Sequence, residues 1–304
     1  MNQIILSKLK CPYCTTHFNN IQRFSNNCAH VSCKCSTFPM LGNVLLLKKT
    51  DAVFEKKILN CASKGNYYHA IWNALHIETK RNRFFLVASL FFSMIHKINM
   101  SIVLRLFILF DSKKKTWLEY VLQTKSRSLT KVALSLVSND IAENEFIVDI
   151  GCGTGEILSL LSNHDDSENI YLGIDKSLYS LVLGSALFSR SHFFILFDVD
   201  ESVPLQSTVV TRILLCDTFP WIKNKEKHLN ELVRIMKPKA RAYIINIHAK
   251  LYQEKIKSFG ISPINLNRFL NKKFHSIIFD HCSMKILRLY RQRKKGFSCI
   301  IEKK

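Results

Sequence analysis

The chain has 304 residues, of which 47% are hydrophobic and 22% are charged, with only 9 glycines and 6 prolines. These proportions exclude a disordered, collagen-like or linker-dominated chain, because enough apolar material is present for a packed core. The formal charge of +21 is typical of proteins that contact nucleic acid or a phospholipid surface. A compositional bias toward Lys, Asn, Ile and Phe would produce the same excess.

The positive charge is distributed unevenly. Residues 1–50 and 51–145 each carry a net +6 and residues 251–304 carry +10, whereas residues 146–250 carry −1. The middle block therefore differs chemically from its basic flanks.

The N-terminal segment is rich in cysteine. Five of the ten cysteines fall within the first 35 residues, and no long apolar run precedes the first polar residues. We therefore expect no signal peptide and a cytoplasmic protein, in which clustered thiols bind metal more often than they form disulfides.

Two short-spaced stretches offer the metal ligands. The first is the knuckle Cys11-Pro-Tyr-Cys14, and the second offers Cys28, His30, Cys33 and Cys35 for two places. Zinc takes four such ligands in a tetrahedron, and a segment this short needs a metal to fold. Free buried thiols are the alternative interpretation.

Residues 50–140 are expected to be mainly helical, beginning with a helix over 51–64 that Asp51 caps. The apolar stretch 84–110 is long enough to span a bilayer, but His96, Lys97 and Arg105 interrupt it. A central charge costs about 2.5–3.5 kcal/mol on insertion. We expect helices that cover the domain that follows and line an apolar pocket, with no transmembrane span. A true membrane span and a peripheral membrane-surface helix are the alternatives.

From residue 146 short strands and helices alternate, which predicts βαβ units and a parallel sheet. The expected strands are 146–150, 170–174, 193–197, 209–216 and 241–247, the expected helices are 155–163, 177–189 and 225–236, and further strand-like segments are 284–290 and 297–301.

The strongest motif, Val-Asp149-Ile-Gly151-Cys152-Gly153-Thr-Gly155, follows the first of these strands. Glycines at alternate positions let the backbone turn sharply and approach a ligand closely, and the next helix presents its free N–H groups.

Acidic residues end the following strands. Asp175 can accept hydrogen bonds from ribose hydroxyls, Asp198 could reach an adenine amino group, and Cys216-Asp217 ends the fourth strand. Such sites form at the carboxyl ends of parallel strands. Each acid alone could be a solvated strand end or a helix cap.

This constellation resembles the class I S-adenosylmethionine-dependent methyltransferases, particularly the type 11 group, over residues 146–247. The resemblance implies that Asp149 and residues 151–155, Cys152 included, hold the methionine portion of S-adenosylmethionine. It implies that Asp175 with Lys176 holds the ribose, that Asp198 with Val199 holds the adenine, and that Cys216 lies beside the sulfur. The family's usual KPGG turn is replaced here by Lys237-Pro238-Lys239-Ala240.

The N-terminal segment resembles the Trm112-like zinc ribbons that precede some type 11 methyltransferases. On this likeness the zinc ligands are Cys11, Cys14, Cys33 and Cys35, with Cys28 or His30 as substitutes. The segment is also loosely similar to the zinc finger of the 23S rRNA guanine methyltransferases.

The predicted fold is α/β: a Rossmann-like, seven-stranded class I methyltransferase sheet with an N-terminal zinc ribbon and a helical insertion. The expected parts are the ribbon (1–49), a helical cap (50–140) and the methyltransferase domain (141–304).

Methyl transfer depends mainly on alignment of the reactants, and His248 or Asp217 would serve as a general base where one is needed. We predict a methyltransferase for a small-molecule or lipid-like acceptor. An RNA methyltransferase that uses the ribbon and the basic tail is the first alternative, and a non-catalytic binding protein is the second.

Overall fold

The computed structural model describes residues 3–49, 51–75, 128–163, 168–187, 192–200, 202–248, 270, 274–280 and 296–304. The chain divides into two compact units. Unit 1 comprises residues 1–125, 153–156 and 175–197, and unit 2 comprises residues 126–152, 157–174 and 198–304. The predicted apolar stretch 84–110 and the strand-like segment 284–290 lie outside the described residues.

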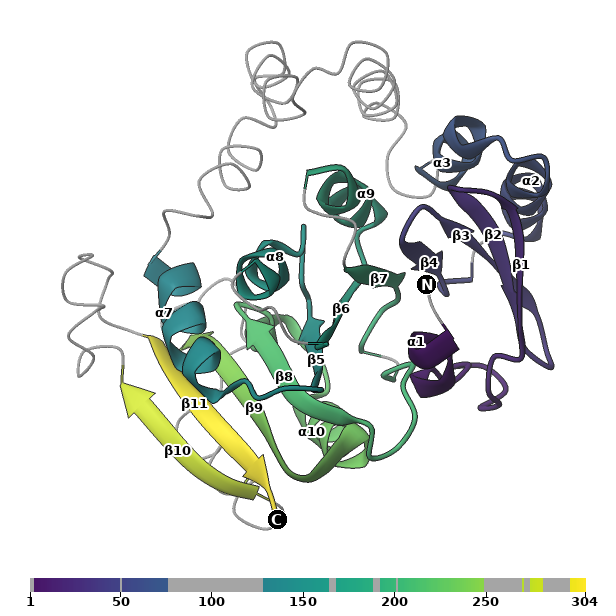
Figure 1. Cartoon of the computed structure of the whole chain (residues 1–304). Helices are drawn as coiled ribbons and strands as arrows, with labels where there is room; N and C mark the ends of the chain where they lie inside the picture. The colour runs from purple at the N-terminus through teal and green to yellow at the C-terminus, as the bar shows by residue number, and fades with distance from the viewer. Residues whose placement is uncertain are drawn as a thin grey trace, which may run out of the picture. The chain divides into compact units, whose positions relative to one another are not determined.

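Unit 1 begins with the ribbon. After helix α1 (Gln3–Lys8), the strands β1 (Asn20–Ser25), β2 (Cys28–Ser32), β3 (Thr37–Leu41) and β4 (Val44–Leu46) pair consecutively and antiparallel (Figure 1). The strands β2, β3 and β4 are largely buried.

The helices α2 (Ala52–Ser63) and α3 (Tyr67–Leu75) follow the ribbon, and α2 packs on β2 and β3. The N–H of Val53 donates to the Asp51 carboxylate at 2.8 Å, so the predicted helix cap is confirmed.

The last strand of the ribbon also pairs with a strand far away in the sequence. Within unit 1, β4 is parallel to β7 (Phe193–Leu196), with Val44 opposite Phe194 and Leu46 opposite Leu196. Helix α9 (Leu178–Leu187) packs on both strands. The side-chain amide of Asn43 donates to the carbonyl of His192 at 2.7 Å, which fixes the start of this pairing.

Unit 2 contains a mixed sheet in the order β6-β5-β8-β9-β11-β10. The strands are β5 (Phe146–Ile150), β6 (Ile170–Asp175), β8 (Val210–Cys216), β9 (Met236–His248), β10 (Phe274–Asp280) and β11 (Gly296–Lys303). The pairs β5–β6, β5–β8 and β8–β9 are parallel, whereas β9–β11 and β11–β10 are antiparallel. The helices are α7 (Ser128–Val137), α8 (Glu156–Ser162) and α10 (Lys225–Ile235).

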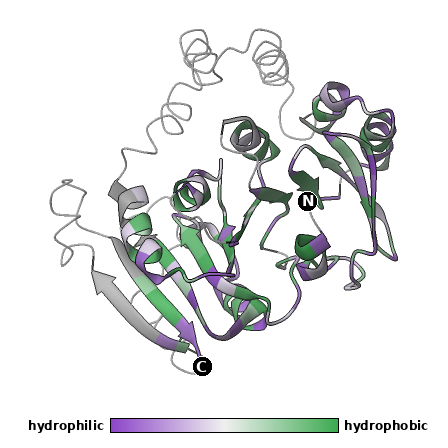
Figure 2. Ribbon diagram, in the orientation of Figure 1, coloured by the Kyte–Doolittle hydropathy of each residue, from purple (hydrophilic) through white to green (hydrophobic). Residues whose placement is uncertain are grey.

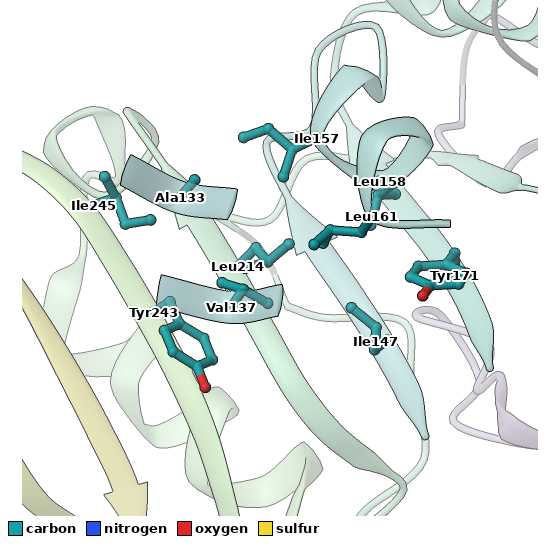
Figure 3. Packing of buried hydrophobic residues seen from close by; sticks show 10 residues of the cluster. All are labelled: Ala133, Val137, Ile147, Ile157, Leu158, Leu161, Tyr171, Leu214, Tyr243 and Ile245. Atoms are coloured by element: carbon teal, nitrogen blue, oxygen red, sulfur yellow. The ribbon is translucent and has the colours of Figure 1, made fainter. Parts of the chain in front are cut away.

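The core of unit 2 lies where α7 and α8 cover the sheet. Ala133 and Val137 of α7 pack with Leu158 and Leu161 of α8 over the buried face of the strands (Figure 3). All five residues of β5 are buried, and β8 is coloured mainly hydrophobic in Figure 2. This burial on both faces explains why the strands are continuous apolar runs in the sequence.

A partly buried ionic network connects this core to the segment before β5. Arg212 of β8 forms ion pairs with Glu145 at 3.0 Å and with Asp140 at 3.3 Å, and Asp140 also pairs with Arg241 at 2.7 Å. Tyr243 donates to Asp140 as well. Burial raises the pKa of Glu145, and Arg212 opposes that rise. The network therefore fixes the turn Ser138–Asp140 to β8 and β9.

The predicted α/β class, with parallel strands and an N-terminal ribbon, is confirmed. The predicted strands are also present, with shifts in their ends: 146–150, 170–174, 193–197, 209–216, 241–247 and 297–301. Strand β10 was not predicted. Strand β9 begins earlier than expected, at Met236. Within it, Lys239 adopts a φ of 62°, at a position where the family that this segment resembles usually has a glycine. No helix within the described ranges is both long enough and apolar enough to cross a bilayer.

Candidate functional site

The carboxyl ends of β6, β5 and β8 lie at one edge of the sheet, and the predicted site residues follow them. In register, Asp149 of β5 stands opposite Gly173 of β6 and opposite Leu214 of β8. Asp149 is 2% exposed. In open sheets of parallel strands this edge is where ligands bind.

Residues 151–155 form a loop, called here the glycine loop, that only glycine-rich sequence can adopt. Gly151, Gly153 and Gly155 have φ values of 75°, 56° and 73°. A Cβ on Gly151 would come within 3.0 Å of the Thr218 side chain, and a Cβ on Gly155 would come equally close to the ring of Phe194. These two glycines are therefore required by packing as well as by backbone conformation.

Gly153 differs from its two neighbours. A Cβ there would meet nothing within 4 Å, so the middle of the glycine loop presents open backbone. Its N–H donates to the Asp175 carboxylate at 2.8 Å. The glycine loop and the last residue of β6 are thereby held together.

Asp175 is fixed by backbone donors on both of its oxygens. Oδ2 accepts from the N–H of Gly153 and Oδ1 accepts from the N–H of Ser177, each at 2.8 Å. Burial raises the pKa of this carboxyl, and the two backbone hydrogen bonds oppose that rise. Each carboxylate oxygen can accept more than one hydrogen bond, so the residue retains acceptor capacity for a ligand hydroxyl. The neighbouring Lys176 is exposed.

Asp198 and Val199 lie in a turn after β7. The Asp198 carboxylate accepts from the N–H of Asp200 at 3.1 Å, and the Asp200 carboxylate accepts from the N–H of Lys223 at 2.9 Å. Beneath this turn, His228 of α10 is 2% exposed. Burial lowers the pKa of His228 to about 4, so it is neutral at physiological pH.

The end of β8 reaches the glycine loop through a residue that the sequence did not single out. The Thr218 hydroxyl lies 3.1 Å from the carbonyl of Cys216 and 3.3 Å from the carbonyl of Gly151, and donates toward both. Asp217 has a φ of 59°, and its N–H donates to the carbonyl of Ile245 at 2.9 Å. A small hydroxyl residue directly after a predicted strand end was the available signal for Thr218.

The structure thus joins some of the predicted residues and leaves others apart. Gly153 contacts Asp175 directly, and Thr218 connects Cys216 to Gly151. Asp198 accepts a hydrogen bond from Asp200 within its own turn. His248 is the last residue of β9, with its backbone paired opposite Gly296. Its role and that of Asp217 as a base stay predictions.

The four predicted cysteines form a second site, called here the cysteine cluster. The sulfur atoms of Cys11, Cys14, Cys33 and Cys35 all lie within 4.8 Å of one another. The separations Cys11–Cys35, Cys14–Cys33 and Cys33–Cys35 are 3.7, 3.7 and 3.5 Å. These are too long for a disulfide, whereas four sulfurs at about 2.3 Å from a zinc ion in a tetrahedron stand about 3.8 Å apart. The donor set and its spacing therefore fit zinc.

The other two candidate ligands have different neighbours. The His30 ring lies 3.2 Å from the carbonyl of Leu59, and Cys28 is buried, with its pKa raised by that burial. Within the cluster, a hydrogen bond from Thr16 lowers the pKa of Cys14 to about 6, whereas burial raises that of Cys11. Of the six candidate ligands, the structure therefore brings together Cys11, Cys14, Cys33 and Cys35.

The strand order, the glycine loop and the carboxylate at the end of β6 together define a Rossmann-like class I methyltransferase fold. Residues 148–244 match the Methyltransf_11 family, described as a methyltransferase domain, which confirms the predicted family for this segment.

Among curated proteins, the chain is similar to "Putative methyltransferase 235L" of Invertebrate iridescent virus 6. The two are 26% identical over 105 residues, which is 34% of this chain and 38% of the viral protein. The matched region thus spans well under half of that relative's length.

Two solved structures are also similar. One is described as "Complex between the Haloferax volcanii Trm112 methyltransferase activator and the putative methyltransferase", with 17% identity, a TM-score of 0.50, and coverage of 61% of this chain and 92% of that chain. This likeness supports the fold. The other is a SAM-dependent methyltransferase from Aquifex aeolicus, with 18% identity, a TM-score of 0.43, and coverage of 57% of this chain and 89% of that chain.

Proposed function

We propose that the protein is an S-adenosylmethionine-dependent methyltransferase. The observation that carries the proposal is the hydrogen bond between the N–H of Gly153 and the Asp175 carboxylate, in a segment that matches a methyltransferase family. This hydrogen bond connects the glycine loop, whose backbone is open at Gly153, to the Asp175 carboxylate at the edge of the sheet where ligands bind. A non-catalytic protein that acted only through its ribbon would need neither the open backbone nor the carboxylate acceptor at this edge.

The residues at this edge suit the three parts of the cofactor. Asp175, with Lys176 beside it, would accept from the two ribose hydroxyls, and Asp198 with Val199 would lie at the adenine. The methionine portion would be held by Asp149 and the backbone of the glycine loop, with Cys152 in the loop and Cys216 beside the sulfur. Open backbone at Gly153 supports this assignment, because a ligand there meets no side chain.

The protein's task in this reaction is alignment. S-adenosylmethionine, when bound, supplies an electrophilic methyl group on a positively charged sulfur. The strand-end residues would hold it in one orientation, which contributes to rate by removing translational and rotational freedom. Asp217, whose backbone is held at a φ of 59° at the end of β8, and His248 at the end of β9 are the proposed bases for an acceptor hydroxyl or amine.

The proposed acceptor is a small or lipid-like molecule. The near-neutral charge of residues 146–250, against the basic flanks, supports this choice, because an RNA-binding face would place cations around the strand ends. The basic segment 251–304, with its net +10, favours RNA as the second candidate.

The cysteine cluster is proposed to hold one zinc ion and to stabilise the ribbon. Since β4 of the ribbon pairs with β7, we further infer that the ribbon supports the methyltransferase strand within one polypeptide. The similar Haloferax volcanii structure, which pairs a Trm112 activator with a methyltransferase, supports this inference.

Calorimetric titration with S-adenosylmethionine tests the cofactor assignment. We expect binding by the wild type, and binding about a hundredfold weaker for Asp175→Asn, because the negative charge and one of the two accepting oxygens are lost. Asp51→Asn, which keeps its helix cap, is the matched control and should bind as the wild type does. No detectable heat from the wild type at millimolar cofactor would reject the proposal.

Labelling of a cell extract tests the acceptor. The extract is incubated with the protein and S-adenosylmethionine that carries a radioactive methyl group, and is then separated into lipid, small-molecule, protein and RNA fractions. Label in the lipid or small-molecule fraction supports the proposed acceptor. Label in RNA favours the second candidate, and RNA retention should then fall steeply as salt rises.

A further inference from the structure

We propose that Tyr13 makes cofactor binding depend on the metal state of the cysteine cluster, through a continuous path of contacts inside unit 1. The inference rests on the proposed function and identifies how the same site would be regulated. Every residue on the path is described and belongs to unit 1.

The path starts inside the first knuckle. Tyr13 lies between Cys11 and Cys14, so its backbone position is set by the cysteine cluster. Its hydroxyl donates to the carbonyl of Leu47 at 2.9 Å and accepts from the N–H of Lys49 at 2.9 Å. The ring stacks on Phe38 with centroids 6.0 Å apart. One side chain thus connects the knuckle to the residues directly after β4.

The second step joins the end of β4 to the end of β7. The N–H groups of Leu47 and Lys48 both donate to the carbonyl of Leu196, at 3.1 and 3.0 Å. Leu47 is 0% exposed and Leu196 is 2% exposed. Because buried backbone groups without partners are costly, the two strand ends cannot separate unless other partners replace these hydrogen bonds.

The third step reaches the cofactor residues. The N–H of Phe197, the residue after β7, donates to the carbonyl of Asp175 at 3.0 Å. The same strand places the ring of Phe194 against Gly155. Four residues, 194–197, therefore contact the ribbon on one side and both Asp175 and the glycine loop on the other.

The physical consequence is a coupling between two ligands. A metal ion that holds the knuckle in place would also hold Tyr13, the end of β4 and, through it, strand β7. It would thereby favour the arrangement of Asp175 that binds the cofactor. Thermodynamic linkage then requires the cofactor to raise metal affinity by the same factor as the metal raises cofactor affinity. Tyr13 is in this account a positioning residue, since it contacts neither ligand through its hydroxyl.

The test is an equilibrium competition between the zinc-loaded full chain and a coloured chelator, with and without saturating S-adenosylmethionine. We expect the cofactor to raise the apparent zinc affinity of the wild type by about tenfold. In Tyr13→Phe, which keeps the ring but loses the hydroxyl, the cofactor should change zinc affinity by less than about twofold. Tyr68→Phe, on α3 and outside the path, should behave as the wild type does.

The outcomes separate this inference from the function on which it rests. If calorimetry shows that the cofactor binds but zinc affinity is unchanged in the wild type, the coupling is wrong and the proposed function stands. If coupling persists in Tyr13→Phe, Tyr13 is not its carrier and the inference is overturned. If the cofactor does not bind at all, the proposed function itself has failed.

Discussion

The cysteine cluster and the glycine loop differ in what holds their residues in place. The cluster gathers four thiols from two stretches separated by fewer than 25 residues, and their sulfur atoms mainly contact one another. The glycine loop is fixed by residues that come from distant strands, namely Asp175 and Thr218. The first site needs a ligand to be complete, whereas the second is completed by the fold itself. Perturbations should therefore act on the two sites in different ways.

Removal of the metal ligands should have the largest effect. We expect Cys11→Ser combined with Cys14→Ser to abolish a content of about one zinc per chain. The thermal stability of the ribbon should fall strongly, because zinc binding is worth about 10–16 kcal/mol in zinc-finger peptides. Elemental analysis and a thermal scan measure these effects. Cys28→Ser is the control and should keep its zinc; loss of zinc from that variant would contradict the assigned ligand set.

Gly151→Ala should break the glycine loop by sterics alone. Both the φ of 75° and the Thr218 side chain within 3.0 Å of the new Cβ oppose alanine, so we expect a loss of about 3–5 kcal/mol in unfolding free energy. Denaturant unfolding measures it. Thr218→Gly added to Gly151→Ala should restore part of the loss, and a failure to do so would mean that the clash is not the cause.

Acid pH should lower the stability of the fold through His228, which lies outside both the cysteine cluster and the glycine loop. Burial holds the pKa of His228 at about 4, against an ordinary value of 6.5, so between these values the unfolded chain binds a proton that the folded chain does not. Stability should therefore fall as pH drops from about 6.5 to 4, by about 3 kcal/mol for this group.

Comparison of unfolding free energy at pH 7 and pH 4.5 for wild type and His228→Phe measures this contribution. The variant should show a shallower pH dependence. Wild type and variant should lose zinc equally at low pH, because protonation of the cysteine thiolates releases the metal and His228 is not one of its ligands. Identical slopes for wild type and variant would be evidence against a neutral buried His228.

Gly153→Ala should have the smallest effect on stability and the clearest effect on the cofactor. A Cβ there meets nothing within 4 Å, so the expected cost is only the left-handed conformation, about 1–2 kcal/mol. Cofactor affinity should fall more than stability does, because the methyl group occupies the open backbone. Paired denaturation and calorimetry compare the two quantities, and an unaffected affinity would place the ligand elsewhere.

Much of the strand-end site could be predicted because its signals are local. The buried strands β5, β6 and β8 are apolar runs, and the glycines and Asp175 directly follow them. Spacing indicated the first knuckle, whereas Cys33 and Cys35 were preferred over Cys28 and His30 only through the family likeness.

The contacts that unite these segments could not be predicted. Strand β4 has three residues, and its partner β7 is about 150 residues away in the sequence, so no local pattern specifies the pairing. The roles of Tyr13, Phe194 and Thr218 likewise depend on neighbours that only the fold supplies. Lys239 at a φ of 62° shows the reverse case, in which the fold overrides the residue's own backbone preference.

Hydrogen exchange with and without S-adenosylmethionine tests the central claim most directly. The account predicts that the cofactor slows exchange in peptides that cover residues 149–156 and 173–178, and that Asp175→Asn removes this protection. Protection confined to other strands, or none at a cofactor concentration that saturates the calorimetric signal, would contradict the assignment of the strand-end site.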